Sequence, residues 1–96
     1  MRIEVEFVGF PTIYDIFQEV SHPHSFSGET LSDLIENLIE KYGERLRESL
    51  LDPGTHAFDP AIQIMVNRQY VGRESLHLKK MKEGDKVTFL RLLAGG

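Results

Sequence analysis

Residues 83–96 read EGDKVTFLRLLAGG and join three signals in one short stretch. Glu83-Gly84-Asp85 is typical of a tight turn, and the apolar residues after it predict a strand from Val87 to Leu93. Gly95 and Gly96 have no side chain to pack in a core. We therefore expect either a frayed terminus or an extended tail that enters a narrow site of another protein. In the second case, the reactive group of the tail is the α-carboxylate of Gly96.

Two more strands are predicted from apolar residues that alternate with polar ones over residues 3–8 and 62–66. A short strand around residues 24–27 is expected to return beside the first. Residues 13–20 carry apolar side chains at helical spacing and predict a brief turn of helix. Residues 67–70 are expected to form a turn, which Asn67 supports because asparagine tolerates left-handed dihedrals.

The clearest helix signal runs from Thr30 to Tyr42, where apolar residues recur at i, i+3, i+4 and i+7. Thr30 is a suitable N-cap, Asp33 is favourable at the third helical position, and Gly43 is a natural stop. A shorter helical turn is expected over residues 44–51. The sequence thus predicts an α+β protein, with residues 1–96 as one domain and one main helix covering a small mixed sheet.

Composition excludes several functional classes. The formal net charge of −4 argues against a nucleic-acid module, and the cluster of Lys79, Lys80 and Lys82 is expected to be a solvated turn. The sequence has no cysteine, which excludes disulfides and cysteine-based metal sites. We expect no membrane span and a cytoplasmic protein. The histidines at positions 22, 24, 56 and 77 are expected to be solvated loop residues rather than metal ligands.

Four segments together resemble the ubiquitin-like β-grasp fold. They are Val5-Glu6-Phe7, the capped helix start Thr30-Leu31-Ser32-Asp33-Leu34, the segment Met65-Val66-Asn67, and the closing stretch of residues 83–96. More closely, the chain resembles the ubiquitin-like small sulfur carriers, such as the molybdopterin synthase small subunit and the thiamine-type carrier. Molybdopterin-type carriers usually have two prolines where this chain has Arg91-Leu92-Leu93. Leu90-Arg91-Leu92 looks like the tail of ubiquitin.

The resemblance implies a function for the terminal residues. Gly96 would be adenylated by a ubiquitin-activating-like adenylyltransferase and then converted to a thiocarboxylate by a sulfur donor enzyme, while Gly95 lets the tail fit a narrow site. The chain would be a carrier and not an enzyme, and its partner would supply both ATP and metal. A cofactor-synthase large subunit is a further expected partner, in molybdopterin, thiamine or tRNA biosynthesis. Two alternatives stay open: a modifier attached to lysines through Gly96, and a non-reactive β-grasp binding subunit.

A docking patch is predicted from strand alternation. If Val87 and Phe89 face the core, then Thr88, Leu90 and Leu92 face away from it. Leu90 and Leu92, with Met65 from a neighbouring strand, would form an uncovered apolar patch of the kind that binds partners. Arg91 is expected either to pair with an acidic groove of a partner or to be a solvated edge charge.

Overall fold

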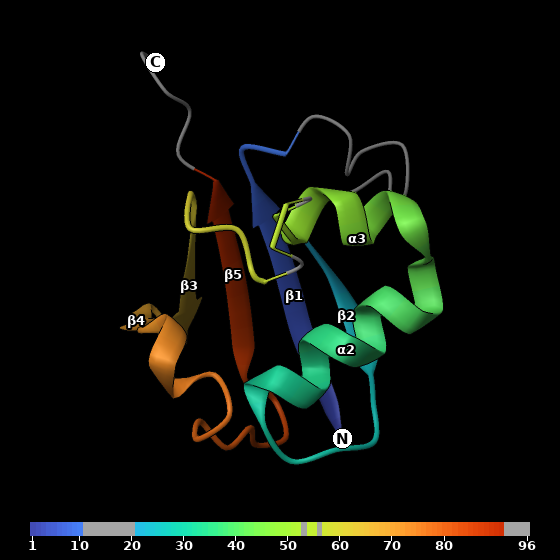
Figure 1. Ribbon diagram of the computed structural model, residues 1–96. Coiled ribbons are helices and arrows are strands. Elements are labelled where there is room, and N and C mark those ends of the chain that lie inside the picture. The colour runs from blue at the N-terminus through green and yellow to red at the C-terminus, as the bar shows by residue number, and fades with distance from the viewer. Residues whose placement is uncertain (11–20, 53, 56, 92–96) are drawn as a thin grey trace.

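A five-stranded mixed sheet carries helices on one of its faces (Figure 1). The computed structural model describes residues 1–10, 21–52, 54–55 and 57–91. The strands are β1 (Arg2–Val8), β2 (Ser21–Ser25), β3 (Ile62–Val66), β4 (Gln69–Val71) and β5 (Lys86–Arg91). The helices are α2 (Leu31–Tyr42), α3 (Glu44–Leu50) and a 3₁₀ turn, η2 (Arg73–Ser75).

The strands lie in the order β2-β1-β5-β3-β4. β1 and β5 pair in parallel, with Val8 opposite Leu90. The pairs β1–β2, β3–β5 and β3–β4 are antiparallel. The last strand therefore lies in the centre of the sheet, next to the first, which is the β-grasp arrangement. The predicted α+β class and fold are confirmed.

Helix α2 begins with a complete capping box, as the sequence predicts. The Asp33 N–H donates to Thr30 Oγ1 at 3.2 Å, and Asp33 Oδ2 accepts from the Thr30 N–H at 3.0 Å. The helix ends at Gly43, which has φ of 81° and donates its N–H to the Ile39 carbonyl at 2.8 Å. These contacts satisfy backbone groups that both helix ends would otherwise leave without partners.

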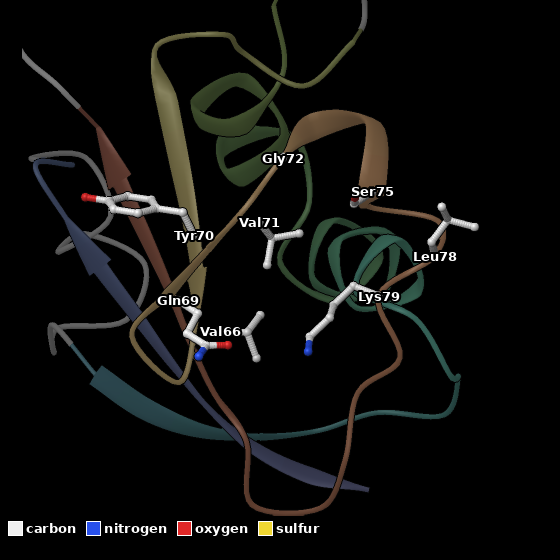
Figure 2. A pocket seen from close by; sticks show the side chains of 8 residues that line it. All are labelled: Val66, Gln69, Tyr70, Val71, Gly72, Ser75, Leu78 and Lys79. Atoms are coloured by element: carbon white, nitrogen blue, oxygen red, sulfur yellow. The ribbon is translucent and has the colours of Figure 1, made fainter.

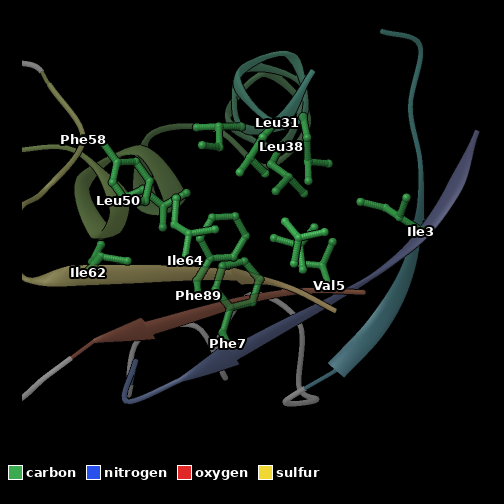
Figure 3. Close-up of a cluster of buried hydrophobic side chains, with 14 of the residues drawn as sticks. Ile3, Val5, Phe7, Leu31, Leu38, Leu50, Phe58, Ile62, Ile64 and Phe89 are labelled. Carbon is green, nitrogen blue, oxygen red and sulfur yellow. The ribbon is translucent and has the colours of Figure 1, made fainter. Parts of the chain in front are cut away.

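The core lies between the sheet and the helices α2 and α3 (Figure 3). Val5, Val87 and Phe89 are fully buried on the sheet side, and Leu34 and Leu38 are fully buried on α2. The Phe7 and Phe89 rings stack at a centroid distance of 5.1 Å, across the parallel pair of central strands. This packing fixes which face of β5 is turned inward, and so which face is left for other contacts.

The shorter helical turn expected over residues 44–51 is confirmed as helix α3, which covers the sheet together with the main helix α2. Several other sequence expectations differ from the structure. The turn after β3 contains only Asn67 and Arg68, both at positive φ, and β4 begins at Gln69. β2 lies earlier than predicted, at Ser21–Ser25. The predicted helical turn at residues 13–20 lies outside the described residues.

His24 is buried, with 2% of its surface exposed, so the expectation of a solvated loop histidine is wrong at this position. Its Nε2 lies 2.9 Å from Asn37 Oδ1 on α2, and its ring packs near Phe26 and Tyr42. Burial lowers the pKa of His24 below its usual value, and the Lys41 ammonium acts in the same direction, while the bond to Asn37 opposes them. His24 is therefore a core residue that joins β2 to α2.

The turn before β5 is held by side-chain hydrogen bonds. Asp85 accepts from the Asn67 amide at 2.8 Å through Oδ1 and from the Lys82 N–H at 2.8 Å through Oδ2. Asn67 Oδ1 in turn accepts from the Lys86 N–H at 2.9 Å. Gly84 takes φ of 84°, a conformation that side chains other than glycine disfavour. The Gly-Asp signal thus fixes where β5 starts, at the end of the sheet opposite Arg91.

Candidate docking face and C-terminal tail

The structure describes β5 as far as Arg91. Leu92, Gly95 and Gly96 lie outside the described residues, so the roles predicted for them stay predictions. Figure 1 places the end of β5 at the same edge of the sheet as the end of β1 and helix α3. The chain that follows Arg91 therefore starts from this edge.

Four apolar side chains lie on the sheet face that the helices leave uncovered. Leu90 of β5 is paired with Val8 of β1, and Met65 of β3 is paired with Tyr70 of β4. Val8 is 39% exposed and Tyr70 67% exposed, while Leu90 and Met65 are half-buried. Leu90 lies opposite Gln63 and Met65 lies opposite Thr88, so Leu90 and Met65 are diagonal neighbours within reach of each other on one face. We call these four apolar residues the outer patch.

The outer patch gives way to polar residues toward the start of β5. Thr88 donates to Glu6 Oε1 at 3.1 Å, and the Lys86 ammonium lies 3.5 Å from Glu6 Oε2. Thr88 lies on this face, as predicted, but it is only 7% exposed because Glu6 and Met65 flank it in the sheet. On β1 and β5, the apolar residues of this face thus lie toward Arg91 and the charged residues lie away from it, with Gln63 of β3 as a polar neighbour of Leu90.

Arg91 contacts other parts of its own chain. Its Nη1 donates to the Ser49 carbonyl at 3.3 Å and lies 3.5 Å from Asp59 Oδ2. The Arg91 side chain is 36% exposed and that of Asp59 is 18% exposed. The prediction that Arg91 binds an acidic groove of a partner is untested, and such a groove would have to share or replace these contacts.

An open pocket of about 290 Å³ lies beside β4 (Figure 2). Val66 and Val71 form its apolar floor, and Lys79 extends across it. Its rim contains Tyr70 and Leu78, which is 76% exposed. The Lys79 ammonium, the Ser75 hydroxyl and the Gln69 amide are a sparse set of groups for holding a triphosphate. The pocket therefore does not argue for a nucleotide site on this chain.

The described residues contain neither a cluster of metal-binding side chains nor a membrane-spanning helix. In that part of the chain, no group of three or more histidine, aspartate or glutamate side chains is placed to hold a metal ion. Within the same residues, no helix is long and apolar enough to cross a membrane. The pKa of Asp33 is lowered by the N–H groups of Glu29 and Thr30, which serve the helix cap rather than a reaction.

The sequence matches the ThiS family over residues 8–96. The chain belongs to the ThiS family. This match includes the strand β5 and extends through Gly95 and Gly96, and it confirms the predicted resemblance to the ubiquitin-like small sulfur carriers. No protein of curated function matches the chain significantly.

Solved structures support the fold. The CysO protein of Mycobacterium tuberculosis is 28% identical, with 95% of this chain and 99% of that chain covered and a TM-score of 0.69. A chain of the Amycolatopsis orientalis BexX/CysO complex is 23% identical, with 98% and 99% covered and a TM-score of 0.70. Small archaeal modifier protein 1 of Haloferax volcanii is 13% identical, with 96% and 98% covered and a TM-score of 0.74. The last two likenesses are evidence of shared fold alone.

Sequence reasoning missed two members of the outer patch. Val8 keeps the alternation of β1 and points away from the core beside Leu90, so its even position at the end of the strand pattern could have revealed it. Tyr70 could not be assigned to this face from the sequence, because the strand β4 spans only three residues and is too short to show a period.

Proposed function

We propose that this chain is a sulfur-carrier protein whose Gly96 carboxylate is adenylated and then converted to a thiocarboxylate. The thiocarboxylate donates sulfur in molybdopterin biosynthesis, or in that of thiamine or tRNA. The chain itself is not an enzyme. Its partners are a ubiquitin-activating-like adenylyltransferase, a sulfur donor enzyme and a cofactor-synthase large subunit, and we place it in the cytoplasm with them.

The chemistry needs an activating partner because a free carboxylate is a poor electrophile. An α-carboxyl group has a pKa of about 3.5, so it is charged at neutral pH. Attack of a carboxylate oxygen on the α-phosphorus of ATP forms an acyl-adenylate and releases pyrophosphate. Sulfide (HS⁻) delivered by the donor enzyme then attacks the carbonyl carbon, so that a C–S bond forms, the C–O bond to the phosphate breaks, and AMP leaves. The ATP and metal sites belong to the partner in this proposal.

The observation that carries the proposal is the ThiS-family match, which runs through the diglycine end. The fold is compatible with it, because the described part of β5 ends at one edge of the sheet, beside an exposed apolar surface. Glycines without Cβ atoms can adopt the dihedrals that a narrow active site imposes. The family match and the geometry thus support the same division of the molecule into a docking body and a reactive end.

Docking is proposed to use the outer patch. Leu90 and Met65 are its centre, Val8 and Tyr70 extend it, and Leu92 follows along the chain. An exposed apolar surface with a polar border is typical of protein interfaces. The Glu6–Lys86 pair supplies such a border at one end.

Intact-mass analysis of the protein purified from its native cells tests the proposal. A thiocarboxylate adds about 16 Da, the same as oxidation of a methionine, so a thiol-alkylating reagent must be added to separate the two. The sequence has no cysteine, so the reagent meets no side-chain thiol. We expect an alkylated species whose modified fragment contains Gly96. A heavier species that does not alkylate, or a mass showing residues beyond Gly96, would contradict the proposal.

A second candidate is a protein modifier joined to lysines through Gly96. Its supporting observation is the shared fold with small archaeal modifier protein 1, together with the ubiquitin-like Leu90-Arg91-Leu92. This function predicts a ladder of conjugates that survives boiling in detergent and contains Gly96 in amide linkage to lysine. The sulfur-carrier function predicts no such ladder. If neither the thiocarboxylate nor conjugates are found, the chain is a non-reactive β-grasp binding subunit.

A further inference from the structure

The side chain of Arg91 joins the end of β5 to the segment that follows α3. One nitrogen, Nη1, makes both contacts, with the Ser49 carbonyl of α3 at 3.3 Å and with Asp59 Oδ2 at 3.5 Å. In Figure 1 the segment after α3 crosses over the sheet near the end of β5 on its way to β3. Arg91 is also the last residue of β5, immediately before the proposed reactive end.

Asp59 is itself held in place by backbone contacts. Its N–H donates to the Leu50 carbonyl at 2.9 Å, and its carbonyl accepts from the Ile62 N–H at 3.0 Å. Its second carboxylate oxygen, Oδ1, accepts from the Ala61 N–H at 2.8 Å. The neighbouring Phe58 carbonyl accepts from Arg73 Nη2 at 2.7 Å. The carboxylate that meets Arg91 is therefore presented by a fixed loop.

The backbone of Arg91 lies close to Gly9 on its other side. Gly9 follows β1 and has φ of 82°. A Cβ atom on Gly9 would lie 2.5 Å from the Arg91 carbonyl oxygen, closer than real Cβ atoms approach an oxygen. The end of β1 and the end of β5 can therefore lie this close only because residue 9 is a glycine.

We propose that Gly9, Asp59 and Arg91 form a tail anchor, which fixes the point from which the reactive end leaves the body of the protein. The inference rests on the proposed adenylation of Gly96. Five residues follow Arg91, so the carboxylate can lie at most roughly 17 Å from it. The tail anchor fixes the position of Arg91 relative to the outer patch, and therefore the point from which this distance is measured. It also gives a role to α3 and to the segment after it that contains Asp59.

Arg91 and Asp59 are positioning residues in this proposal, because they act on the tail and do not contact the reacting atoms. Loss of their ion pair should leave docking through the outer patch intact and reduce the share of docked chains in which Gly96 is correctly placed. A partly exposed ion pair shifts such a population by up to about fivefold. The loss should therefore appear in kcat and not in KM.

The test compares wild type with the variants Asp59→Asn, Arg91→Gln and the double variant. ATP–pyrophosphate exchange is measured with the cognate adenylating enzyme over a range of carrier concentrations. We expect kcat to fall about three- to fivefold in each single variant, with KM within about twofold of wild type. The double variant should fall no further, because the two residues act as one unit. Arg91→Lys should recover most of the loss, since one ammonium can replace Nη1.

Glu44→Gln is the matched control, because it neutralises a carboxylate of the exposed Glu44–Arg47 pair on α3. It should leave kcat unchanged. Equal effects of Glu44→Gln and Asp59→Asn, additive losses in the double variant, or a change in KM alone would overturn the tail anchor. No exchange with wild type would instead overturn the proposed function. Independently of the enzyme, the ¹⁵N order parameter of the Arg91 side chain should fall in Asp59→Asn, and an unchanged value would refute the anchor.

Discussion

Replacement of Leu38 by alanine should strongly destabilise the fold. Leu38 lies in the middle of α2 and is fully buried between the helix and the sheet (Figure 3). Alanine keeps the helix, because it has the highest helix propensity of all residues. The change therefore tests the packing between α2 and the sheet and not the formation of the helix.

The magnitude follows from the atoms removed. Leucine to alanine deletes three carbon groups, which at ~0.8 kcal/mol each lose ~2.4 kcal/mol of transfer free energy. A cavity that the surrounding core cannot refill adds roughly 1 kcal/mol, so the free energy of unfolding should fall by about 3 kcal/mol. For a domain of this size, such a loss lowers Tm by roughly 12–24 °C.

Urea titration of wild type, Leu38→Ala and Glu36→Ala measures the effect. Glu36 is exposed on the same helix, so its substitution should change the free energy of unfolding by no more than about 0.5 kcal/mol. A loss below about 1 kcal/mol for Leu38→Ala, or equal losses for both variants, would show that the buried face of α2 has been misassigned.

Three further predictions concern the pH response, the helix cap and the docking face. Wild type should lose stability as the pH falls from about 6.5 to the lowered folded-state pKa of His24, because the unfolded chain binds a proton there that the folded chain does not; urea titrations across this range should show a smaller slope for His24→Gln. Thr30→Ala should cost about 1 kcal/mol in the same assay, by removing the acceptor for the Asp33 N–H. Leu90→Ala should raise the Kd for the adenylating enzyme about tenfold in calorimetry, whereas its exposed cross-strand neighbour Gln63, changed to alanine, should stay within about twofold.

The parts of the fold that local signals determine could be predicted from the sequence. The Thr30–Asp33 capping box, the Gly43 stop and the alternation in β1 and β3 depend on neighbouring residues, and each is present in the structure. The Gly84-Asp85 signal was recognised as a turn, but its bonds to Asn67 join residues far apart in the sequence.

The features that the sequence did not predict depend on tertiary contacts. His24 is polar and lies beside a proline, and only the packing of β2 under α2 makes it a core residue. β4 is too short to show a period and exists because it pairs with β3. The contact between Arg91 and Asp59 has no local signal, since the two residues meet only when the segment after α3 crosses the sheet. Leu90 and Met65 were correctly expected on the uncovered face, because strand alternation decides that.

The most direct test of the central claim is ATP–pyrophosphate exchange by the cognate adenylating enzyme with three forms of the chain. They are wild type, a form that lacks Gly96, and a form with one residue added after Gly96. The added residue displaces the carboxylate by up to about 3.5 Å, and a misplacement of about 1 Å can cost on the order of a hundredfold in rate. We predict exchange with wild type and near-background exchange with the other two, while all three remain folded. Equal exchange with all three forms would show that the Gly96 carboxylate is not the reacting group.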